Sequence, residues 1–531
     1  MKLRLKTAAE MPKVSDDGKV YTFKIKQGIY FADDPAFGGK KRELTAQDYI
    51  YSIQRMVDPA HRGAPWDFLY KGKVLGLDEK IAAAKNGKFD YDSPVEGLVA
   101  LDRYTFQIKL KAPDYNMPYI MAVPANVAVA REVVEKYGDE LDAHPVGTGP
   151  YKLKLWQRRN RILLEANPNF RGERYEPVAG ATGIDPVVHK QLQGKVFPQV
   201  GNIDIRIIET PQSAWLAFDD GGLDVMAEFD ASYVSVVAPG GKVAQKYLDR
   251  GWQYERIAPS AIQVKQFNME DPVVGGYTPE KVALRRAFAL AFNTNKMIWL
   301  VKNGQATEAN SPLAPSITGF DPNFKNALHE FSPAKGNSLL DLFGYKDCDG
   351  DGLRELPGCK PLTITYLTSI GKDDRDDEAM VQKSWALLGI KCEIKKVQFP
   401  DLLSARDTGK FQMAVFVWNA DYPDAENFMQ LLYGPNKGAV NNTRFEHKEF
   451  DQLYRQIATM PDSPERNAKL RRMSRIVSAY VPWAYEFHTL YSHVSQPWVQ
   501  GYKPFPTGFP YFLYTDIDTK KRESILGKRA N

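Results

Sequence analysis

Beyond about residue 150, the sequence alternates between segments typical of buried strands and segments typical of helices. Residues 362–367, 379–389 and 390–397 give a strand, a helix and a second strand in succession. This alternation predicts an α/β architecture, because each helix connects two strands of a sheet and covers one of its faces. A chain of 531 residues is too long to fold around one hydrophobic core. At about 100–200 residues per domain, we expect two to four domains.

Local signals predict several elements with defined ends. Residues 20–26 alternate as a half-buried strand does, and Thr45 with Asp48 resembles a capping box at the start of a helix. We expect one strand over 255–268 and a helix over 296–301.

One strand, at 411–417, ends in an aromatic ring and a carboxylate. The segment is rich in β-forming apolar residues, and Trp418, Asn419, Ala420 and Asp421 follow it. A proline and a further aspartate then stop the strand and start a loop. Open α/β sheets bind ligands at such strand ends, so this segment is the first candidate for a binding site.

Charge and hydropathy argue against a nucleic-acid partner and against a membrane span. A net charge of +5 from 70 basic and 65 acidic residues is a mixed surface, which disfavours nucleic acid as a partner. No segment reaches the roughly 18 apolar residues of a membrane span. Residues 1–18 lack the apolar core of a signal peptide, which taken alone indicates a cytoplasmic protein.

Motifs of enzyme chemistry are absent or incomplete. The seven histidines are scattered without zinc-ligand spacing, and no nucleophile–base pair has a recognisable arrangement. The Gly147-x-Gly149 segment lacks the third glycine of a dinucleotide loop and the lysine of a phosphate loop, so we interpret it as a rigid turn. Ser332-x-x-Lys335 matches penicillin-recognising enzymes, but the companion motifs are missing, and a helix N-terminus is the better interpretation.

A calcium-like loop begins at Asp347. Asp347, Asp349 and Asp351 occupy positions 1, 3 and 5, and a glycine occupies position 6. Position 12 is Gly358, where a calcium loop has a bidentate glutamate, so only part of the ligand set is present. Calcium is the only cofactor that the sequence suggests, and the alternative is an acidic surface turn.

Two cysteines bracket the same loop. A loop rich in Gly, Asp and Pro can bring its ends together, so Cys348 and Cys359 can form a disulfide in an oxidising compartment; two unlinked thiols are the alternative. Cys392 alternates with apolar positions, and we expect it to be a buried core thiol.

A series of segments then follows in a recognisable order and spacing. They are YTFKIKQGIYF, LTAQDYIYSIQRMVDP, LDRYTFQIKLKAP, HPVGTGPYKL with NPNF, AFDDGGLDV, QFNM with VALRRAFALAFNTNKMI, PLAP, LLDLFGYKDCDGDGLRELPG and VWNADYPD. In this order the chain resembles the family 5 extracellular solute-binding proteins of ABC importers, the dipeptide- and oligopeptide-binding group. The resemblance covers essentially the whole chain.

The resemblance implies a two-lobe, periplasmic-binding-protein-like fold of type II, with a hinge and an extra domain in the first lobe. The extra domain would be residues 1–145, the lobe I core 146–255 with 490–531, and lobe II 256–489. Members of the family begin with a signal peptide and a first strand, whereas only twenty residues precede Tyr21 here. We therefore expect a truncated chain or a misplaced start, which leaves lobe I without a strand and with unpaired backbone groups.

The resemblance also implies a function. A periplasmic receptor, not an enzyme, would close over a peptide and deliver it to the membrane permease of an importer, and it would work as a monomer. The same fold also binds oligosaccharides, opines or nickel chelates, and a ligand sensor or chaperone without a transporter is a further alternative.

Site residues follow from the resemblance as well. In peptide-binding relatives an acidic residue after a tryptophan holds the ligand ammonium group, and Asp421 stands at that position after Trp418. The backbone around Asn419 and Ala420 would pair with an extended peptide. Trp483 and Tyr485 resemble the aromatic pair that lines the same cleft. The alternative for Asp421 is a carboxylate that caps a helix or a turn.

Overall fold

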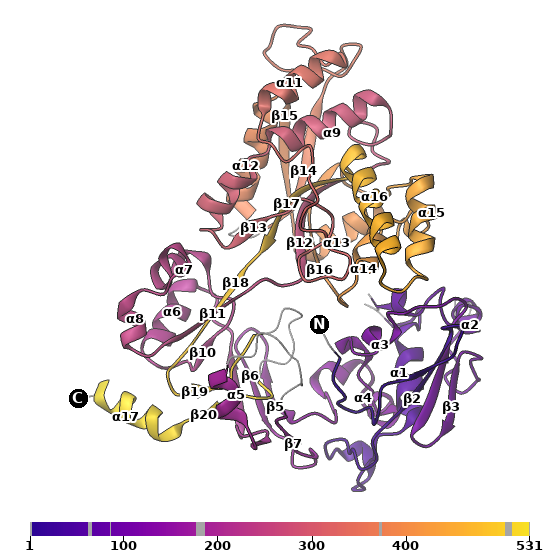
Figure 1. Cartoon of the computed structure of the whole chain (residues 1–531), viewed down its shortest axis with the longest axis vertical. Coiled ribbons are helices and arrows are strands. Elements are labelled where there is room, and N and C mark those ends of the chain that lie inside the picture. The colour runs from indigo at the N-terminus through magenta and orange to yellow at the C-terminus, as the bar shows by residue number, and fades with distance from the viewer. Residues whose placement is uncertain are drawn as a thin grey trace. The chain divides into compact units, whose positions relative to one another are not determined.

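The computed structural model describes residues 3–61, 66–84, 87–176, 186–370, 374–504 and 512–529 (Figure 1). Contacts divide the chain into two compact units. Unit 1 comprises 1–233, 243–255 and 492–531, and unit 2 comprises 234–242 and 256–491. The predicted lobe boundaries lay at 255/256 and 489/490, and the division of lobe I into an extra domain and a core stays a prediction.

Unit 1 begins with a four-stranded antiparallel sheet. Its order is β1 (Lys13–Val14), β2 (Val20–Lys24), β4 (Thr105–Lys109) and β3 (Leu98–Asp102). The alternation along β2 buries Tyr21 and Phe23, as the sequence predicted. Helix α1 (Ala46–Met56) packs on this sheet through Tyr49, whose ring stacks on Phe106 at 5.3 Å.

The start of α1 is held by a buried carboxylate. Asp48 Oδ2 accepts hydrogen bonds from the Thr45 backbone N–H at 2.7 Å and the Thr45 hydroxyl at 2.9 Å, which confirms the predicted capping residues. Arg42 donates to Asp48 Oδ1 at 2.6 Å and to the more exposed Glu132 at 2.7 Å. The carboxylate therefore neutralises a partly buried guanidinium and caps the helix at once.

The rest of unit 1 is built from short sheets. An antiparallel hairpin joins β5 (Tyr151–Gln157) and β6 (Arg161–Ala166), and β9 (Asn202–Arg206) pairs with β6. A second sheet has the order β10 (Val225–Met226), β18 (Tyr491–Ser495) and β11 (Gln253–Ile257). Because β11 and β18 contain the division points at 255/256 and 491/492, they carry the chain between the units.

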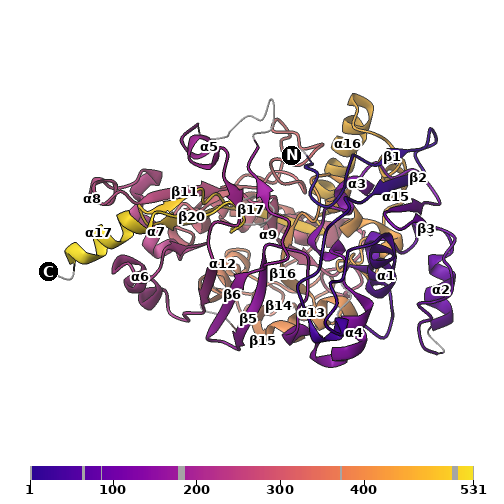
Figure 2. The same cartoon turned by 90° about the horizontal axis from the view of Figure 1, so that it is seen from below.

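Helices and two small strand pairs complete unit 1. In Figures 1 and 2, α1 and α2 lie at one end of the unit, and α17 lies at the other. The elements are β7 (Glu173–Arg174), β8 (Val196–Phe197), β19 (Val499–Gln500), β20 (Asp516–Ile517), α2 (Leu77–Ala84), α3 (Met117–Ile120), α4 (Arg131–Tyr137), α5 (Pro186–Leu192), α6 (Pro211–Asp219), α8 (Gln245–Asp249) and α17 (Thr519–Arg529), while α7 (Ala231–Val237) spans a unit boundary.

Unit 2 contains a six-stranded mixed sheet. Its order is β13 (Ala306–Glu308), β17 (Trp483–Thr489), β12 (Ala261–Phe267), β16 (Met413–Asn419), β14 (Thr363–Ser369) and β15 (Lys391–Val397). The predicted strand–helix–strand at 362–397 is confirmed, and its two strands pair in parallel. The alternation of side chains along the central strands gives the sheet two apolar faces.

Helices cover both faces of this sheet and form two cores. One core contains side chains of α9 (Pro279–Ala291), α11 (Pro333–Leu342) and α12 (Asp374–Ala386). The other contains side chains of α14 (Glu426–Met429), α15 (Lys448–Ile457) and α16 (Pro464–Tyr480), and α13 (Phe399–Thr408) belongs to a smaller cluster. Figure 1 shows the two helix groups on opposite sides of the strands.

Three sequence expectations need correction. The single strand predicted over 255–268 is two strands, β11 and β12, because Pro259 cannot donate a ladder hydrogen bond. The helix predicted over 296–301 is a short α10 (Thr294–Lys296) followed by a π-helical turn at Met297–Val301. Cys392 is only partly buried at the edge of the first core. None of the described helices is both long and apolar enough to cross a membrane.

We expect Asp48→Ala to destabilise unit 1 by about 3 kcal/mol, because it removes the cap and leaves Arg42 without its buried partner. Thermal or urea unfolding measures the loss. Glu132→Ala is the matched control, since it removes only the more exposed partner of Arg42 and should cost less than about 1 kcal/mol. Equal effects of the two substitutions would contradict this account.

Candidate functional site

Trp418 lies near the end of β16, beside β12 and against the core that contains α14, α15 and α16. It pairs with Ile262 across the antiparallel β12–β16 ladder, and its ring stacks on Phe416 with centroids 6.1 Å apart. The ring is partly buried, whereas the next residue, Asn419, is exposed. The strand thus presents one aromatic surface at its carboxyl end, as the sequence predicted for an α/β sheet.

Asn427 on α14 joins the ring to the carboxylate. Its Oδ1 accepts hydrogen bonds from Trp418 Nε1 and from the Asp421 backbone N–H, each at 3.0 Å. Its Nδ2 donates to Asp421 Oδ2 at 2.7 Å. Sequence reasoning missed Asn427, because its partners Trp418 and Asp421 lie in the strand and the loop before α14 and no local pattern marks it.

Asp421 is a carboxylate in an unfavourable environment. Burial raises its pKa to about 6, the nearby Glu426 adds to the rise, and the hydrogen bond from Asn427 opposes it. In the part of the chain that the structure describes, no lysine or arginine forms an ion pair with this carboxylate. A cation placed beside it would therefore be stabilised by an otherwise uncompensated charge.

The neighbouring acidic residues already have strong partners. Asp424 forms a bidentate ion pair with Arg466, at 2.9 and 2.6 Å. Glu426 accepts hydrogen bonds from the hydroxyls of Tyr422 and Tyr454. These contacts hold the loop after β16. Among the described residues, Asp421 accepts a side-chain hydrogen bond from the Asn427 amide alone, whereas Asp424 has an arginine and Glu426 has two hydroxyl donors.

The backbone of β16 has a free edge next to this carboxylate. On one side β16 pairs with β12 along its whole length, but on the other side β14 pairs only with Met413 and Ala414. Within the described residues, 415–419 thus have ladder partners on one side alone. The Ala420 N–H is already used, since it donates to the Ser260 carbonyl at 2.8 Å.

Trp483 and Tyr485 lie on β17, which pairs with the edge of β12 opposite to β16. Trp483 is 2% exposed and packs on Phe416 at 5.6 Å, within the second core. Tyr485 pairs with Val264, and burial of its hydroxyl raises its pKa. In this structure the two rings belong to the same core as Trp418, and a contact with a ligand stays a prediction.

A large cavity lies elsewhere, inside unit 1. Its volume is about 1030 Å³, and its lining includes Phe23, Tyr49, Phe106 and Trp156. The lining contains none of the site residues that the sequence predicted. The cavity therefore belongs to unit 1, whereas the strand-end residues belong to unit 2.

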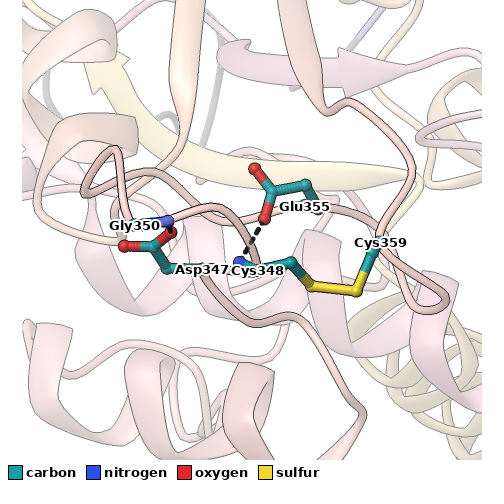
Figure 3. The surroundings of a disulfide bond; sticks show 5 residues. All are labelled: Asp347, Cys348, Gly350, Glu355 and Cys359. Carbon is teal, nitrogen blue, oxygen red and sulfur yellow. Dashed lines mark hydrogen bonds between the residues drawn. A yellow bond between two sulfur atoms is a disulfide. The ribbon is translucent and has the colours of Figure 1, made fainter.

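The loop after α11 brings acidic groups and the two cysteines together (Figure 3). Cys348 and Cys359 are joined by a disulfide, with Cα atoms 5.8 Å apart. Asp347, Asp349 and Glu355 each offer a carboxylate oxygen, and these oxygens lie within 4.8 Å of one another. Glu355, at position 9 of the loop, takes the place that the sequence assigned to Asp351, which accepts instead from the Leu353 N–H at 2.7 Å.

This arrangement fits part of a calcium site. Calcium takes six to eight oxygen ligands, and three carboxylates supply only some of them. All three carboxylates also accept backbone hydrogen bonds: Asp347 from Gly350 at 2.7 Å, Asp349 from Asp351 at 3.1 Å and Glu355 from Cys348 at 2.7 Å. These bonds orient the side chains within the loop that the disulfide closes.

Calcium binding here stays a prediction that titration calorimetry tests. We expect heat that saturates at one ion per chain and is lost in Asp349→Asn, because that change removes one of the converging charges. Asp376→Asn, on an exposed part of α12, is the control. Absence of heat at millimolar calcium would contradict the prediction.

A family model covers most of the chain. Residues 2–439 match the bacterial extracellular solute-binding proteins of family 5. The chain is 24% identical over 524 residues to "Di/tripeptide-binding protein 2" of Pseudomonas aeruginosa, covering 96% of this chain and 86% of that protein. It is also 24% identical over 518 residues to "Heme-binding protein A" of Haemophilus influenzae, covering 96% and 84%.

Solved structures share the fold. The periplasmic binding protein DppA of Helicobacter pylori, in complex with a peptide, superposes with a TM-score of 0.74 at 20% identity, covering 97% of this chain and 89% of that one. The oligopeptide-binding protein AppA of Bacillus subtilis, in complex with a nonapeptide, gives 0.71 at 18% identity, covering 95% and 88%. The two-lobe α/β fold expected from the sequence is confirmed. The chain belongs to the bacterial extracellular solute-binding proteins of family 5.

Proposed function

We propose that this chain is the peptide receptor of an ABC importer, which binds a di- or oligopeptide in the periplasm and delivers it to the membrane permease. The observation that carries the proposal is the partly buried Asp421 carboxylate, which no cation compensates within the described residues. A relative that is named for di- and tripeptides supports the choice of ligand. Membership of a family of binding proteins supports a role without catalysis.

The chemistry of a peptide matches the strand-end site. A peptide ammonium group beside Asp421 would form a charge-assisted hydrogen bond, worth about 1.5–3 kcal/mol. The open edge of β16 at 415–419 offers backbone groups to an extended chain. The ring of Trp418 offers an apolar surface to one of its side chains.

Other solutes of the family make different demands. An oligosaccharide, an opine or a nickel chelate does not require an acidic anchor for a terminal ammonium group, and one relative is named for heme. Mass spectrometry of the solute that co-purifies with the chain from its natural host separates these cases. Peptides would support the proposal, whereas a sugar, a chelate or a porphyrin would replace it.

We expect Asp421→Asn to weaken the binding of a peptide with a free amino terminus by more than about tenfold, because it removes the counter-charge and keeps the shape. Calorimetry with a peptide identified by the co-purification experiment measures the change. Asp401→Asn, at an exposed position on α13, is the control. Unchanged affinity in Asp421→Asn would refute the anchoring role.

The pH dependence of binding gives a second test. Because the pKa of Asp421 is raised to about 6, its carboxyl is neutral below that pH and charged above it. We expect peptide affinity to fall as the pH is lowered from 7 through 6 to 5, and the fall to vanish in Asp421→Asn. An equally steep fall in both proteins would assign the effect to another group.

A further inference from the structure

Unit 2 buries three charged side chains that the proposed binding function does not use. Lys265 on β12 lies between Asp377 on α12 and Glu486 on β17, with Nζ 2.6 Å from Asp377 Oδ1 and 2.7 Å from Glu486 Oε1. The three side chains are 0%, 8% and 1% exposed. They come from three elements that pack together in the first core.

Glu486 reaches this position through a β-bulge. The β12–β17 register changes from Gln263 opposite Phe487 to Val264 opposite Tyr485, so that Glu486 is the extra residue of β17. Bulges redirect side chains at chosen positions of a sheet. Here the bulge brings a carboxylate to the same ammonium group that Asp377 already neutralises.

The neighbours of the cluster add hydrogen bonds and aromatic faces. The Tyr366 hydroxyl on β14 donates to Asp377 Oδ2 at 2.6 Å, and the Gln263 amide lies 2.9 Å from Glu486 Oε2. Lys265 Nζ also lies 5.7 Å from the centre of the Phe292 ring and 5.5 Å from that of Tyr366.

Other charged and titratable groups on the packed elements are engaged elsewhere. Glu378 on α12 pairs with Lys396 at 2.6 Å, and His488 on β17 contacts the Ala261 carbonyl through Nδ1 at 2.8 Å. Lys302, after the π-helical turn, lies over the ring of Phe487 at 5.7 Å. Among the described residues, the only ion pairs of the two cluster carboxylates are those with Lys265.

The charges of the cluster do not balance. One ammonium group and two carboxylates leave a net charge of −1 in a core where an uncompensated ion is expensive. Two carboxylates that share one site do not both ionise readily, and a proton resolves the conflict. We propose that Glu486 retains a proton at neutral pH, so that the cluster is a neutral, pH-sensitive link between β12, β17 and α12.

The donors around each carboxylate assign the proton to Glu486. Asp377 accepts from Lys265 through Oδ1 and from the Tyr366 hydroxyl through Oδ2, so a donor already faces each of its oxygens. The second oxygen of Glu486 accepts from the Gln263 amide at 2.9 Å, and the same amide with its oxygen and nitrogen exchanged would accept a carboxyl proton from Glu486. Burial raises the pKa of Glu486, and the charge of Asp377 adds to this rise, against the opposing effects of Lys265 and of the hydrogen bond from Gln263.

The direction of the pH effect follows from this assignment. A carboxyl whose pKa is raised on folding holds a proton that the unfolded chain releases, so its contribution to stability is lost as the pH rises through the folded pKa. Lys265 acts in the same direction at higher pH, where Glu486 has also ionised: burial alone would lower the pKa of Lys265, but Asp377 and Glu486 raise it above its ordinary value. Unit 2 should therefore lose stability towards alkaline pH.

The test compares urea unfolding of the full chain and of Glu486→Gln between pH 5 and 8. The substitution keeps the shape and removes the proton, so the unfolding equilibrium constant of the natural chain, divided by that of the variant, should rise by up to about tenfold per pH unit. Glu393→Gln, at an exposed position on β15, is the control and should leave the ratio flat. A flat ratio for Glu486→Gln overturns the proposal.

Infrared spectroscopy keeps the proposal testable if Glu486→Gln does not fold. At pH 8, where Asp421 is ionised, the folded Asp421→Asn chain should retain the absorption of a protonated carboxyl group, and Asp377→Asn should lose it because the competing charge is gone. Loss of the absorption in Asp377→Asn supports the assignment. Absence of the absorption in a chain with an intact cluster overturns it.

Discussion

Strand β12 pairs with β16 along its whole length and with β17 along most of it, and the rest of unit 2 is built around this pairing. Its ladder with β16 runs from Ala261 to Phe267, and β17 pairs with its other edge. Because alternate side chains point to opposite faces, Ile262 and Val264 enter one core while Phe267 enters the other. The candidate site and the buried charge cluster both depend on this arrangement, one at the end of the strand and one at its middle.

The two sites solve the same electrostatic problem in different ways. Asp421 and Glu486 are both carboxyl groups whose pKa is raised by burial. Around Glu486 the fold supplies a lysine, an amide and a closed core, so a proton completes the balance within the protein. Around Asp421 the fold supplies one amide and an exposed strand end, and we propose that a ligand supplies the missing positive charge.

Rigidity around Asp421 matters as much as its charge. Asn427 is fully buried and bonds to both the ring and the carboxylate, while Arg466 anchors Asp424 from α16. A ligand group would meet side chains already held in place, and less ordering entropy would be lost on binding. The adjacent open edge of β16 would then orient an extended peptide by backbone hydrogen bonds.

The sequence by itself determined the local elements and the family. Periodicity located β2, β14 and β15, Thr45 and Asp48 marked the start of α1, and the apolar run before Trp418 identified β16, since each depends on residues close together in the chain. Only the tertiary structure decided which distant groups meet. Asn427 acquires its role from the fold of the loop after β16, and Trp483 is buried in the core. Lys265 meets Asp377, which lies 112 residues further along the chain, and Glu486, which stands at a β-bulge of β17. Pairing across such distances is set by sheet register and helix packing, which no local pattern encodes.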